Sequence, residues 1–228
     1  MRAAVVLLSG GLDSSALLRF VLRREACSPV YALSVRYGQK HDRELDCARR
    51  QAEIMAVREH RVLDLSGYGV LAGGASALTG SALPVPDLRD IADDEKDQPS
   101  TYVPNRNMIL LSLAAAYAEA NNCRRVYYGA QRQDRYGYWD CTAEFVARMN
   151  ALLALNRRNP VELRAPFVDM RKSEVLKLGL ELGLDPGQTW TCYRGDALPC
   201  GACPSCVERR EAFRELGLDD PLGRSGPD

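Results

Sequence analysis

The residues best suited to chemistry in this chain form one turn near the N-terminus, Ser9-Gly10-Gly11-Leu12-Asp13-Ser14-Ser15. Two adjacent glycines let the backbone turn tightly and come close to a ligand. The apolar residues 3–8 before the turn predict a buried strand, and the pattern from Ser14 onwards predicts a helix. Because a helix N-terminus presents N–H groups and partial positive charge, the turn indicates a phosphate site.

Two common phosphate-binding motifs do not match this turn. No Lys follows it in the G-x-x-x-x-G-K-[ST] pattern, and the glycine spacing differs from the G-x-G-x-x-G of dinucleotide-binding folds. A Ser-Gly-Gly-x-Asp-Ser turn after a first strand resembles the pyrophosphate loop of ATP pyrophosphatases, which split ATP between its α and β phosphates. The resemblance implies that ATP is bound by Leu8, Ser9, Gly10, Gly11, Leu12, Asp13, Ser14 and Ser15. The alternative is an ordinary strand–helix turn.

Four of the eight cysteines cluster near the C-terminus, at Cys192, Cys200, Cys203 and Cys206. Two Cys-x-x-Cys steps share Cys203, so several sulfurs can reach one ion. Four thiolates at such spacings are typical of a structural zinc site, in which protein ligands occupy every coordination position. An iron–sulfur centre is the second possibility. A redox dithiol accompanied by two incidental cysteines is the third.

Two cations stand where predicted helices begin. Asn107 is the candidate N-cap of a helix that ends at residue 121. This places Arg106 beside a helix start, where the helix dipole does not explain a positive charge, and where a guanidinium is suited to a carboxylate or a phosphate. Lys172 begins a helix over residues 172–182 and could reach a transferring phosphate. Solvated surface positions are the alternative for both cations.

The segment Gly129–Cys141 follows a predicted strand and carries three aromatic residues, two Asp and two Arg. Loops at the carboxyl ends of parallel strands line the ligand crevice of open sheets. Aromatic rings can stack on a planar heterocycle, and Asp134 and Asp140 can accept hydrogen bonds from a guanine-like edge. A polar surface loop is the alternative, although three large aromatic side chains are unusual in a loop that is exposed to solvent.

The remaining pattern predicts the elements that position these residues. Strands are expected over residues 3–8, 30–35, 60–65, 125–129 and 161–166, and helices from residue 14 and over residues 45–56, 107–121, 143–155 and 172–182. Residues 66–100 are rich in Gly, Ala, Pro and Asp and are expected to form a long loop. Strands that alternate with helices predict an α/β, doubly wound, mainly parallel sheet.

Composition narrows the classes of protein. The chain has 228 residues, a formal net charge of zero and 46% hydrophobic residues, which predicts a moderate-sized fold with its own core. We divide it into an ATP-pyrophosphatase domain over residues 1–185, a cysteine segment over 186–216 and a polar, frayed tail over 217–228. The neutral charge argues against a dominant nucleic-acid surface. With no membrane span and no signal-peptide pattern in the sequence, a cytoplasmic location is expected.

The motifs in this order resemble the 7-cyano-7-deazaguanine synthases of queuosine biosynthesis. The matching residues are Ser9–Ser14, Tyr37–His41 with Glu44-Leu45, Tyr102-Val103-Pro104 with Arg106-Asn107, Gly137-Tyr138, Asp140-Cys141, Lys172–Glu174, Thr191–Tyr193 and Cys200–Cys206. The resemblance covers about residues 3–215 and implies an adenine nucleotide alpha-hydrolase-like fold. It also implies a reaction in which ATP adenylates the carboxylate of 7-carboxy-7-deazaguanine, ammonia forms the amide, and a second ATP activates the amide for conversion to the nitrile.

The residues and the resemblance together suggest roles for individual side chains. The predicted catalytic residues are Asp13, Arg106 and Lys172. The predicted substrate-binding residues are Arg106, Asn107, Asp134, Tyr138 and Asp140, and the predicted ligands of structural Zn²⁺ are Cys192, Cys200, Cys203 and Cys206. Mg²⁺ is expected with ATP, and the resemblance suggests a homodimer. Free ammonia is the simplest nitrogen donor because the chain shows no glutamine amidotransferase domain.

The chain departs from the family pattern on the substrate side. The recognition loop usually reads Glu-Thr-Asp-Phe/Tyr-Ser-Gly-Tyr-Pro-Asp-Cys, whereas here Arg132 replaces an acid, Arg135 an aromatic residue and Trp139 a proline. Asn105 likewise replaces the glycine of a Pro-Gly-Arg-Asn motif. These changes keep open a ligase that transfers the activated acid to another amine, on a protein or other macromolecule. A tRNA-modifying pyrophosphate-loop enzyme and a non-catalytic, zinc-stabilised nucleotide sensor are further alternatives.

Overall fold

The computed structural model describes residues 2–40, 42–72, 74–79, 83–91, 99–132, 134 and 137–223. The sequence predictions for Arg135, and for the end of the tail at residues 224–228, lie outside the described residues. Within these ranges, none of the helices combines the length and the apolar character that crossing a membrane requires.

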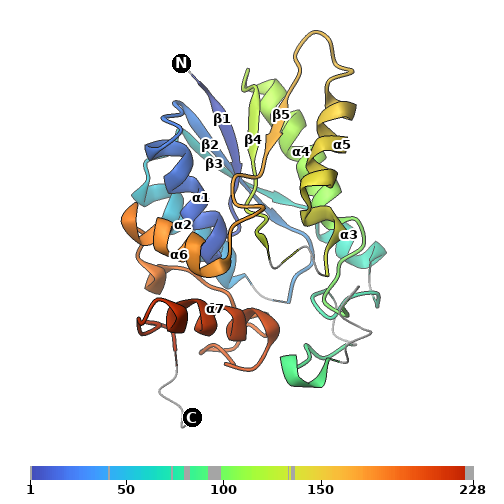
Figure 1. The fold of residues 1–228 in the computed structure, drawn as a ribbon. Coiled ribbons are helices and arrows are strands. Elements are labelled where there is room, and N and C mark those ends of the chain that lie inside the picture. Colours follow the sequence, from blue (N-terminus) through green and yellow to red (C-terminus); the bar gives the residue numbers. More distant parts are fainter. Residues whose placement is uncertain are drawn as a thin grey trace.

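A five-stranded sheet forms the centre of the molecule (Figure 1). Its strands are β1 (Ala4–Leu7), β2 (Val30–Arg36), β3 (Glu59–Asp64), β4 (Arg125–Tyr127) and β5 (Glu162–Arg164). Their pairings are all parallel, in the order β3-β2-β1-β4-β5. The order reverses at β1, and such a reversal opens a crevice at the carboxyl ends of the strands, where ligands bind in open α/β sheets.

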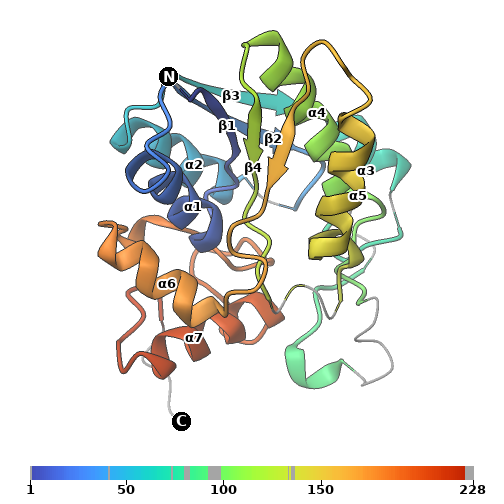
Figure 2. The ribbon, with the colours of Figure 1, turned by 45° about the horizontal axis from the view of Figure 1, so that its top comes forward.

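Helices cover both faces of the sheet. On one face lie α1 (Leu12–Arg23), α2 (Arg43–Ile54) and α6 (Lys172–Glu181), and on the other lie α4 (Arg106–Ala120) and α5 (Ala143–Leu153), as Figure 1 shows. The helix α7 (Pro204–Glu215) packs against α6 and lies beyond the carboxyl ends of the strands (Figure 2). The short helix α3 (Ser66–Leu71) follows β3. The predicted α/β fold with a parallel sheet is therefore confirmed.

The strand β1 shows why the sequence takes this arrangement. Its residues are apolar throughout, and successive side chains of a strand point to opposite faces of the sheet. Ala4 and Val6 pack with α1, α2 and α6, whereas Val5 packs with α4 and α5. A strand buried on both faces has no polar side to expose, which favours a central position in a parallel sheet.

Some helical segments are not revealed by the sequence pattern. The helix α3 and a short 3₁₀ turn, Leu88–Asp90, lie within the stretch predicted as a loop. The helix α7 lies within the cysteine segment, and its buried positions are Ser205, Cys206, Arg209, Ala212 and Phe213. This spacing is helical, but two of the buried positions carry Ser and Arg. Apolar periodicity therefore does not detect the helix.

The start of α4 differs from the sequence prediction. The helix begins at Arg106, so Asn107 lies inside its first turn and is not the N-cap. Asn105 takes the N-cap position with φ 55° and ψ 21°, a left-handed conformation that glycine adopts freely and that Asn tolerates better than most residues. The replacement of glycine by Asn105 is therefore compatible with the backbone of this turn.

Candidate active site

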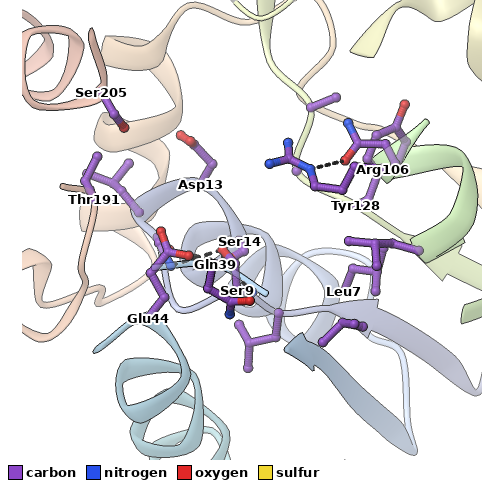
Figure 3. Close-up of a pocket in the computed structure, with 18 of the residues that line it drawn as sticks. Leu7, Ser9, Asp13, Ser14, Gln39, Glu44, Arg106, Tyr128, Thr191 and Ser205 are labelled. Atoms are coloured by element: carbon purple, nitrogen blue, oxygen red, sulfur yellow. Dashed lines mark hydrogen bonds between the residues drawn. The ribbon is translucent and has the colours of Figure 1, made fainter. Parts of the chain in front are cut away.

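A cavity of about 270 Å³ lies at the carboxyl ends of β1 and β2, where the strand order reverses. Its walls come from the turn after β1, the end of β2, the starts of α2, α4 and α6, the segment after β4, and the cysteine segment. Figure 3 shows the side chains of Asp13 and Arg106 on facing sides, with Ser14 and Ser9 below them in this view. Residues that are far apart in the sequence and suited to phosphate and carboxylate binding therefore meet in one place.

The turn after β1, called here the phosphate turn (residues 8–15), is held by two of its own side chains. Ser14 Oγ accepts hydrogen bonds from Ser9 N–H and Gly10 N–H, both at 3.2 Å, and lies 3.0 Å from Ser9 Oγ. Gly11 N–H donates to Ser9 Oγ at 3.2 Å. Because backbone N–H groups donate to two hydroxyls of the turn, its backbone is fixed at the start of α1, where a helix N-terminus is suited to an anion.

Gly10 lets the phosphate turn lie directly on α2. Its φ of +88° is in the left-handed region, and a Cβ atom there would meet Glu44 O at 2.0 Å and Ala48 N at 2.5 Å. Both contacts are with the backbone of a helix, which cannot move aside as the end of a side chain can. Only glycine fits this position without displacing α2.

Most of the predicted ATP-binding residues line the cavity, namely Leu8, Ser9, Gly11, Leu12, Asp13 and Ser14. Gly10 and Ser15 lie behind this lining. The Gly10 carbonyl accepts a hydrogen bond from Trp190 N–H at 3.1 Å. Ser15 is fully buried, and its hydroxyl has no hydrogen-bond partner among the described residues. These two residues support the turn rather than face its ligand.

Lys172 and three carboxyl groups form a charged cluster on one wall. Lys172 Nζ lies 2.7 Å from Asp13 Oδ2 and 4.0 Å from Glu208 Oε2. Burial alone would lower the pKa of Lys172, but the charges of Asp13, Glu208 and Asp134 raise it above its usual value. Burial raises the pKa of Asp134 to about 7, with Lys172 acting against the rise. The cluster thus holds one fixed cation and one carboxyl group that changes charge near neutral pH.

Arg106 is a cation without an acidic partner in the part of the chain that the structure describes. Its guanidinium lies 5.6 Å from the centre of the Tyr37 ring, with Nη1 at 3.5 Å from Tyr37 Oη. Its Nε donates to Asn107 Oδ1 at 3.4 Å. The charge of Arg106 acts against the rise in the pKa values of the buried Glu44 and Asp140, but no described carboxylate forms an ion pair with it. The fork of donors is therefore suited to a planar anionic group of a ligand.

The predicted substrate-binding residues divide into two groups. Asn107, Asp134 and Tyr138 line the cavity together with Arg106. Asp140 lies behind this wall, where its buried carboxylate accepts a hydrogen bond from Asn107 N–H at 3.2 Å. Asp140 thereby satisfies one of the N–H groups that the first turn of a helix leaves unpaired, and it fixes the start of α4 beside the cavity.

Two of the substituted positions in the recognition loop lie outside the described lining of the cavity. Trp139 is 46% exposed, and its indole N–H donates to Tyr102 Oη at 3.0 Å. Arg132 is also absent from the lining residues that the structure describes. The third substituted residue, Arg135, lies outside the described residues. The changes at Arg132 and Trp139 therefore leave the described wall of the cavity unaltered.

The four clustered cysteines meet at one point. Their Sγ atoms all lie within 4.8 Å of one another, and those of Cys200 and Cys206 are 4.0 Å apart. A zinc ion with Zn–S bonds of about 2.3 Å holds its four sulfurs roughly 3.8 Å apart. The backbone N–H groups of Arg194 and Cys200 donate to Cys192 Sγ, and the backbone N–H of Cys203 donates to Cys200 Sγ, at 3.3–3.4 Å. Such donors stabilise thiolate ligands, so the cluster is suited to a metal ion.

The cysteine segment also forms a wall of the cavity, which its spacing does not reveal. Thr191 and Tyr193 flank the first cysteine, and Ser205 and Glu208 lie on α7; all four line the cavity. Glu44, at the start of α2, lines it as well, and burial raises the pKa of Glu44 to about 7. The only sequence signal for these residues is that they lie within or beside the matching motifs.

Comparisons with known proteins agree with this geometry. The chain matches the family model of the queuosine biosynthesis protein QueC over residues 3–217. It is 42% identical over 224 residues to the 7-cyano-7-deazaguanine synthase of Trichodesmium erythraeum, covering 96% of this chain and 99% of the relative. It is 44% identical over 219 residues to the protein of the same name from Caldicellulosiruptor saccharolyticus, covering 96% of this chain and 94% of the relative.

A solved structure shares the fold. The NMN synthetase of Francisella tularensis superposes with a TM-score of 0.54 at 14% sequence identity, covering 96% of this chain and 78% of that chain. At this level of identity the likeness concerns the arrangement of strands and helices alone.

Proposed function

The chain belongs to the QueC family of queuosine biosynthesis proteins, and from this we propose that its cavity converts 7-carboxy-7-deazaguanine into 7-cyano-7-deazaguanine with ammonia and ATP. The substrate carboxylate attacks the α-phosphorus of ATP, which gives an acyl-adenylate and pyrophosphate. Ammonia displaces AMP and loses a proton, which gives the amide. The amide oxygen attacks a second ATP with release of pyrophosphate, and loss of AMP and of both N–H protons then leaves the nitrile.

In this proposal the phosphate turn binds the pyrophosphate half of ATP. The hydroxyls of Ser9 and Ser14 accept hydrogen bonds from backbone N–H groups; the Ser14 hydroxyl donates to Gly11 O at 3.2 Å, and the Ser9 hydroxyl can donate to a phosphate oxygen. The N-terminus of α1 adds its partial positive charge. Lys172 opposes the negative charge that grows on the departing pyrophosphate, and Asp13 holds its ammonium group at 2.7 Å.

Asp13 also suits the Mg²⁺ that accompanies ATP. Its Oδ2 accepts the bond from Lys172, while its Oδ1 is buried without a hydrogen-bond partner among the described residues. Carboxylate oxygens and nucleotide phosphates are the usual ligands of Mg²⁺ in ATP-dependent enzymes. Asp13 would hold the ion, which supplies charge neutralisation at the phosphates when it is bound.

The observation that carries the substrate assignment is the guanidinium of Arg106 facing the phosphate turn without an acidic partner among the described residues. A carboxylate held by Arg106 lies toward the nucleotide site, as adenylation requires. Asp134 offers a carboxylate to the N–H groups of a guanine-like edge, and Tyr138 is fixed by a 2.7 Å contact between its Oη and Thr101 Oγ1. These side chains complete the substrate side of the cavity.

For the cysteine cluster we propose Zn²⁺ in a structural role. The sulfur spacing agrees with tetrahedral coordination, and four thiolates leave no open position for a substrate. Cys192, Cys203 and Cys206 are buried, which shields a metal site from solvent. An ion bound there would hold residues 192–206, and with them one wall of the cavity.

The alternative functions are not favoured. The curated relatives that match 96% of the chain are named 7-cyano-7-deazaguanine synthase. The acceptor-ligase hypothesis rests on Arg132, Arg135 and Trp139, and two of these lie outside the described cavity lining. A tRNA-modifying enzyme would need a basic surface, whereas the formal net charge is zero.

Three further proposals concern the organisation of the protein. Residues 1–185 form the ATP-pyrophosphatase domain, with the metal-binding segment 186–216 packed on it and the tail 217–228 at its end. The chain assembles as a homodimer, which sedimentation of the purified protein tests. It acts in the cytoplasm, which microscopy of a tagged chain tests.

Purified protein incubated with Mg-ATP, ammonium and 7-carboxy-7-deazaguanine is expected to yield the free nitrile, AMP and pyrophosphate. Two AMP should form per nitrile, because both oxygen atoms of the carboxylate must leave. Mass spectrometry identifies the product, and chromatography of the nucleotides gives the ratio. Absence of pyrophosphate at saturating substrates would overturn the assignment as an enzyme, and a covalent adduct on a macromolecule would favour the acceptor ligase.

Arg106→Gln is expected to raise the KM for 7-carboxy-7-deazaguanine about 10- to 100-fold, because charge-assisted hydrogen bonds to a carboxylate are lost. The KM for ATP should change far less, since the nucleotide lies on the opposite wall. Steady-state kinetics measure both values. Arg124→Gln is the matched control, because Arg124 is exposed and follows the far end of α4. A raised KM for ATP with an unchanged KM for the acid would place Arg106 at the nucleotide instead.

A further inference from the structure

The C-terminal segment is tied to the fold by a buried ion pair. Arg209, on α7, is 3% exposed, and its Nε and Nη2 donate to the two carboxylate oxygens of Asp220 at 2.8 and 2.9 Å. A bidentate pair of this kind fixes the plane of the guanidinium as well as its distance. The prediction of a frayed tail is therefore wrong for the part around Asp220, although neighbouring residues of the tail are exposed.

The other donors of Arg209 reach the segment that lies on the phosphate turn. Its Nη1 donates to Thr189 Oγ1 at 2.7 Å and to Thr191 Oγ1 at 3.3 Å, and its Nη2 donates to Pro186 O at 2.9 Å. Thr189 and Thr191 are buried. Arg209 thus forms hydrogen bonds with the residues on either side of Trp190 in the sequence.

Trp190 in turn sets the orientation of one peptide in the phosphate turn. Its N–H donates to Gly10 O at 3.1 Å. In a trans peptide the carbonyl and the following N–H point in opposite directions. The bond to Gly10 O therefore directs Gly11 N–H away from Trp190 and toward Ser9 Oγ, to which it donates at 3.2 Å. Gly11 and Ser9 both line the cavity, so the N–H group that holds the Ser9 hydroxyl there is oriented from outside the turn.

We propose that Asp220 and Arg209 are positioning residues for ATP, which act through residues 189–191 on the orientation of Gly11 N–H. The inference rests on the proposed function, because it takes the ligand of the phosphate turn to be ATP. Neither side chain lines the cavity in the described structure. Without the Asp220 carboxylate, the Arg209 guanidinium keeps only the neutral acceptors Thr189, Thr191 and Pro186. It loses the bidentate contact that fixes the orientation of its plane. The contacts to Thr189 and Thr191 then loosen, and so does the peptide that they hold.

The test compares Asp220→Asn with the wild-type protein. The Kd of α,β-methylene-ATP, measured by calorimetry, should rise about 3- to 10-fold, the effect of weakening one hydrogen-bonded link. The KM for ATP should rise by the same factor, with kcat and the KM for the deazaguanine acid unchanged. Asp220→Glu should restore much of the affinity. Glu144→Gln is the control, since it removes an exposed ion pair with Arg148 on α5.

The analogue cannot be split between its α and β phosphates, and its binding needs neither acid nor ammonia. The measurement therefore reports on the inference even if the chain makes no nitrile. Unchanged analogue binding with a lower melting temperature would overturn the inference, because the pair would then only stabilise the fold. Equal rises in the KM values of both substrates would overturn it as well.

A second variant keeps the test valid if Asp220→Asn does not fold. Thr189→Val preserves the shape of a buried side chain that does not line the cavity, and it removes the acceptor that Arg209 binds at 2.7 Å. The expected result is the same selective loss of analogue affinity. Wild-type affinity in a folded Thr189→Val protein would contradict the proposed path from Arg209 to the turn.

Discussion

Lys172→Met is expected to lower kcat about 100- to 1000-fold, the usual effect of removing one charged group that is aimed at developing charge in a buried site. Lys172 is the cation of a cluster whose other members are the carboxyl groups of Asp13, Glu208 and Asp134. Met keeps the length and apolar stem of the side chain but leaves these groups without their counter-charge. In the proposed mechanism both ATP-dependent steps use the same turn, so amide and nitrile formation should slow together.

Titration of Asp134 gives this variant a second readout. Lys172 holds the pKa of Asp134 down against the effect of burial. Loss of the ammonium removes that opposing effect, so Asp134 should take up its proton at a higher pH than in the wild-type protein. NMR titration of the carboxyl group measures the shift.

Lys177→Met is the matched control for Lys172→Met. Lys177 is exposed on the same helix, so it undergoes the same chemical change without contact to the cluster. Its kcat should equal that of the wild-type protein. A folded Lys172→Met protein with wild-type kcat would show that Lys172 neutralises acidic side chains without contributing to catalysis.

Cys203→Ser is expected to abolish binding of the zinc ion proposed for the cysteine cluster and to destabilise the fold by several kcal/mol, since metal binding is part of the folding free energy of such sites. Cys203 is buried and belongs to the cluster in which all four sulfurs lie within 4.8 Å of one another. Its loss also removes support from α7 and from the cavity wall around Thr191. Metal analysis, thermal unfolding and the affinity for α,β-methylene-ATP measure these effects.

Cys123→Ser controls for the chemical change itself. Cys123 is also buried, at 2% exposure, but it lies among the residues packed on α4 and away from the cluster. This variant should keep its zinc and lose much less stability. If Cys203→Ser retains full zinc and an unchanged melting profile, the four-cysteine assignment is wrong. Iron and visible absorbance in the wild-type protein would favour the iron–sulfur alternative.

The fold and the phosphate turn could be predicted because their signals are local. Apolar runs such as β1 reveal strands buried on both faces, and the glycines after β1 reveal the turn. The order of strands and helices then restricts the sheet to a parallel arrangement with ligands at its carboxyl edge. Asp13 and Lys172 follow such signals, and the structure places them 2.7 Å apart.

The rest depends on tertiary contacts that no local pattern encodes. Asp140 has the residue type of a substrate ligand, but its carboxylate is used by the first turn of α4. The buried face of α7 includes Ser205 and Arg209, so apolar periodicity misses it. Asp220 stands in a polar tail, and only the folded chain shows its bidentate partner. The residues whose roles could not be predicted from the sequence are buried polar side chains, because their roles depend on partners that are distant in the chain.

The contact of Gly10 with α2 has a consequence for the energetics of turnover. The backbone of the phosphate turn lies against that of the helix, with no room even for a Cβ atom between them. The entropy cost of ordering the turn is therefore met once, when the chain folds, and does not reduce the affinity for each nucleotide. A loop that relaxed between ligands would incur this cost twice for every nitrile. If both ATP molecules bind at this turn as proposed, a turn held by its packing on α2 binds the second ATP without a further ordering cost.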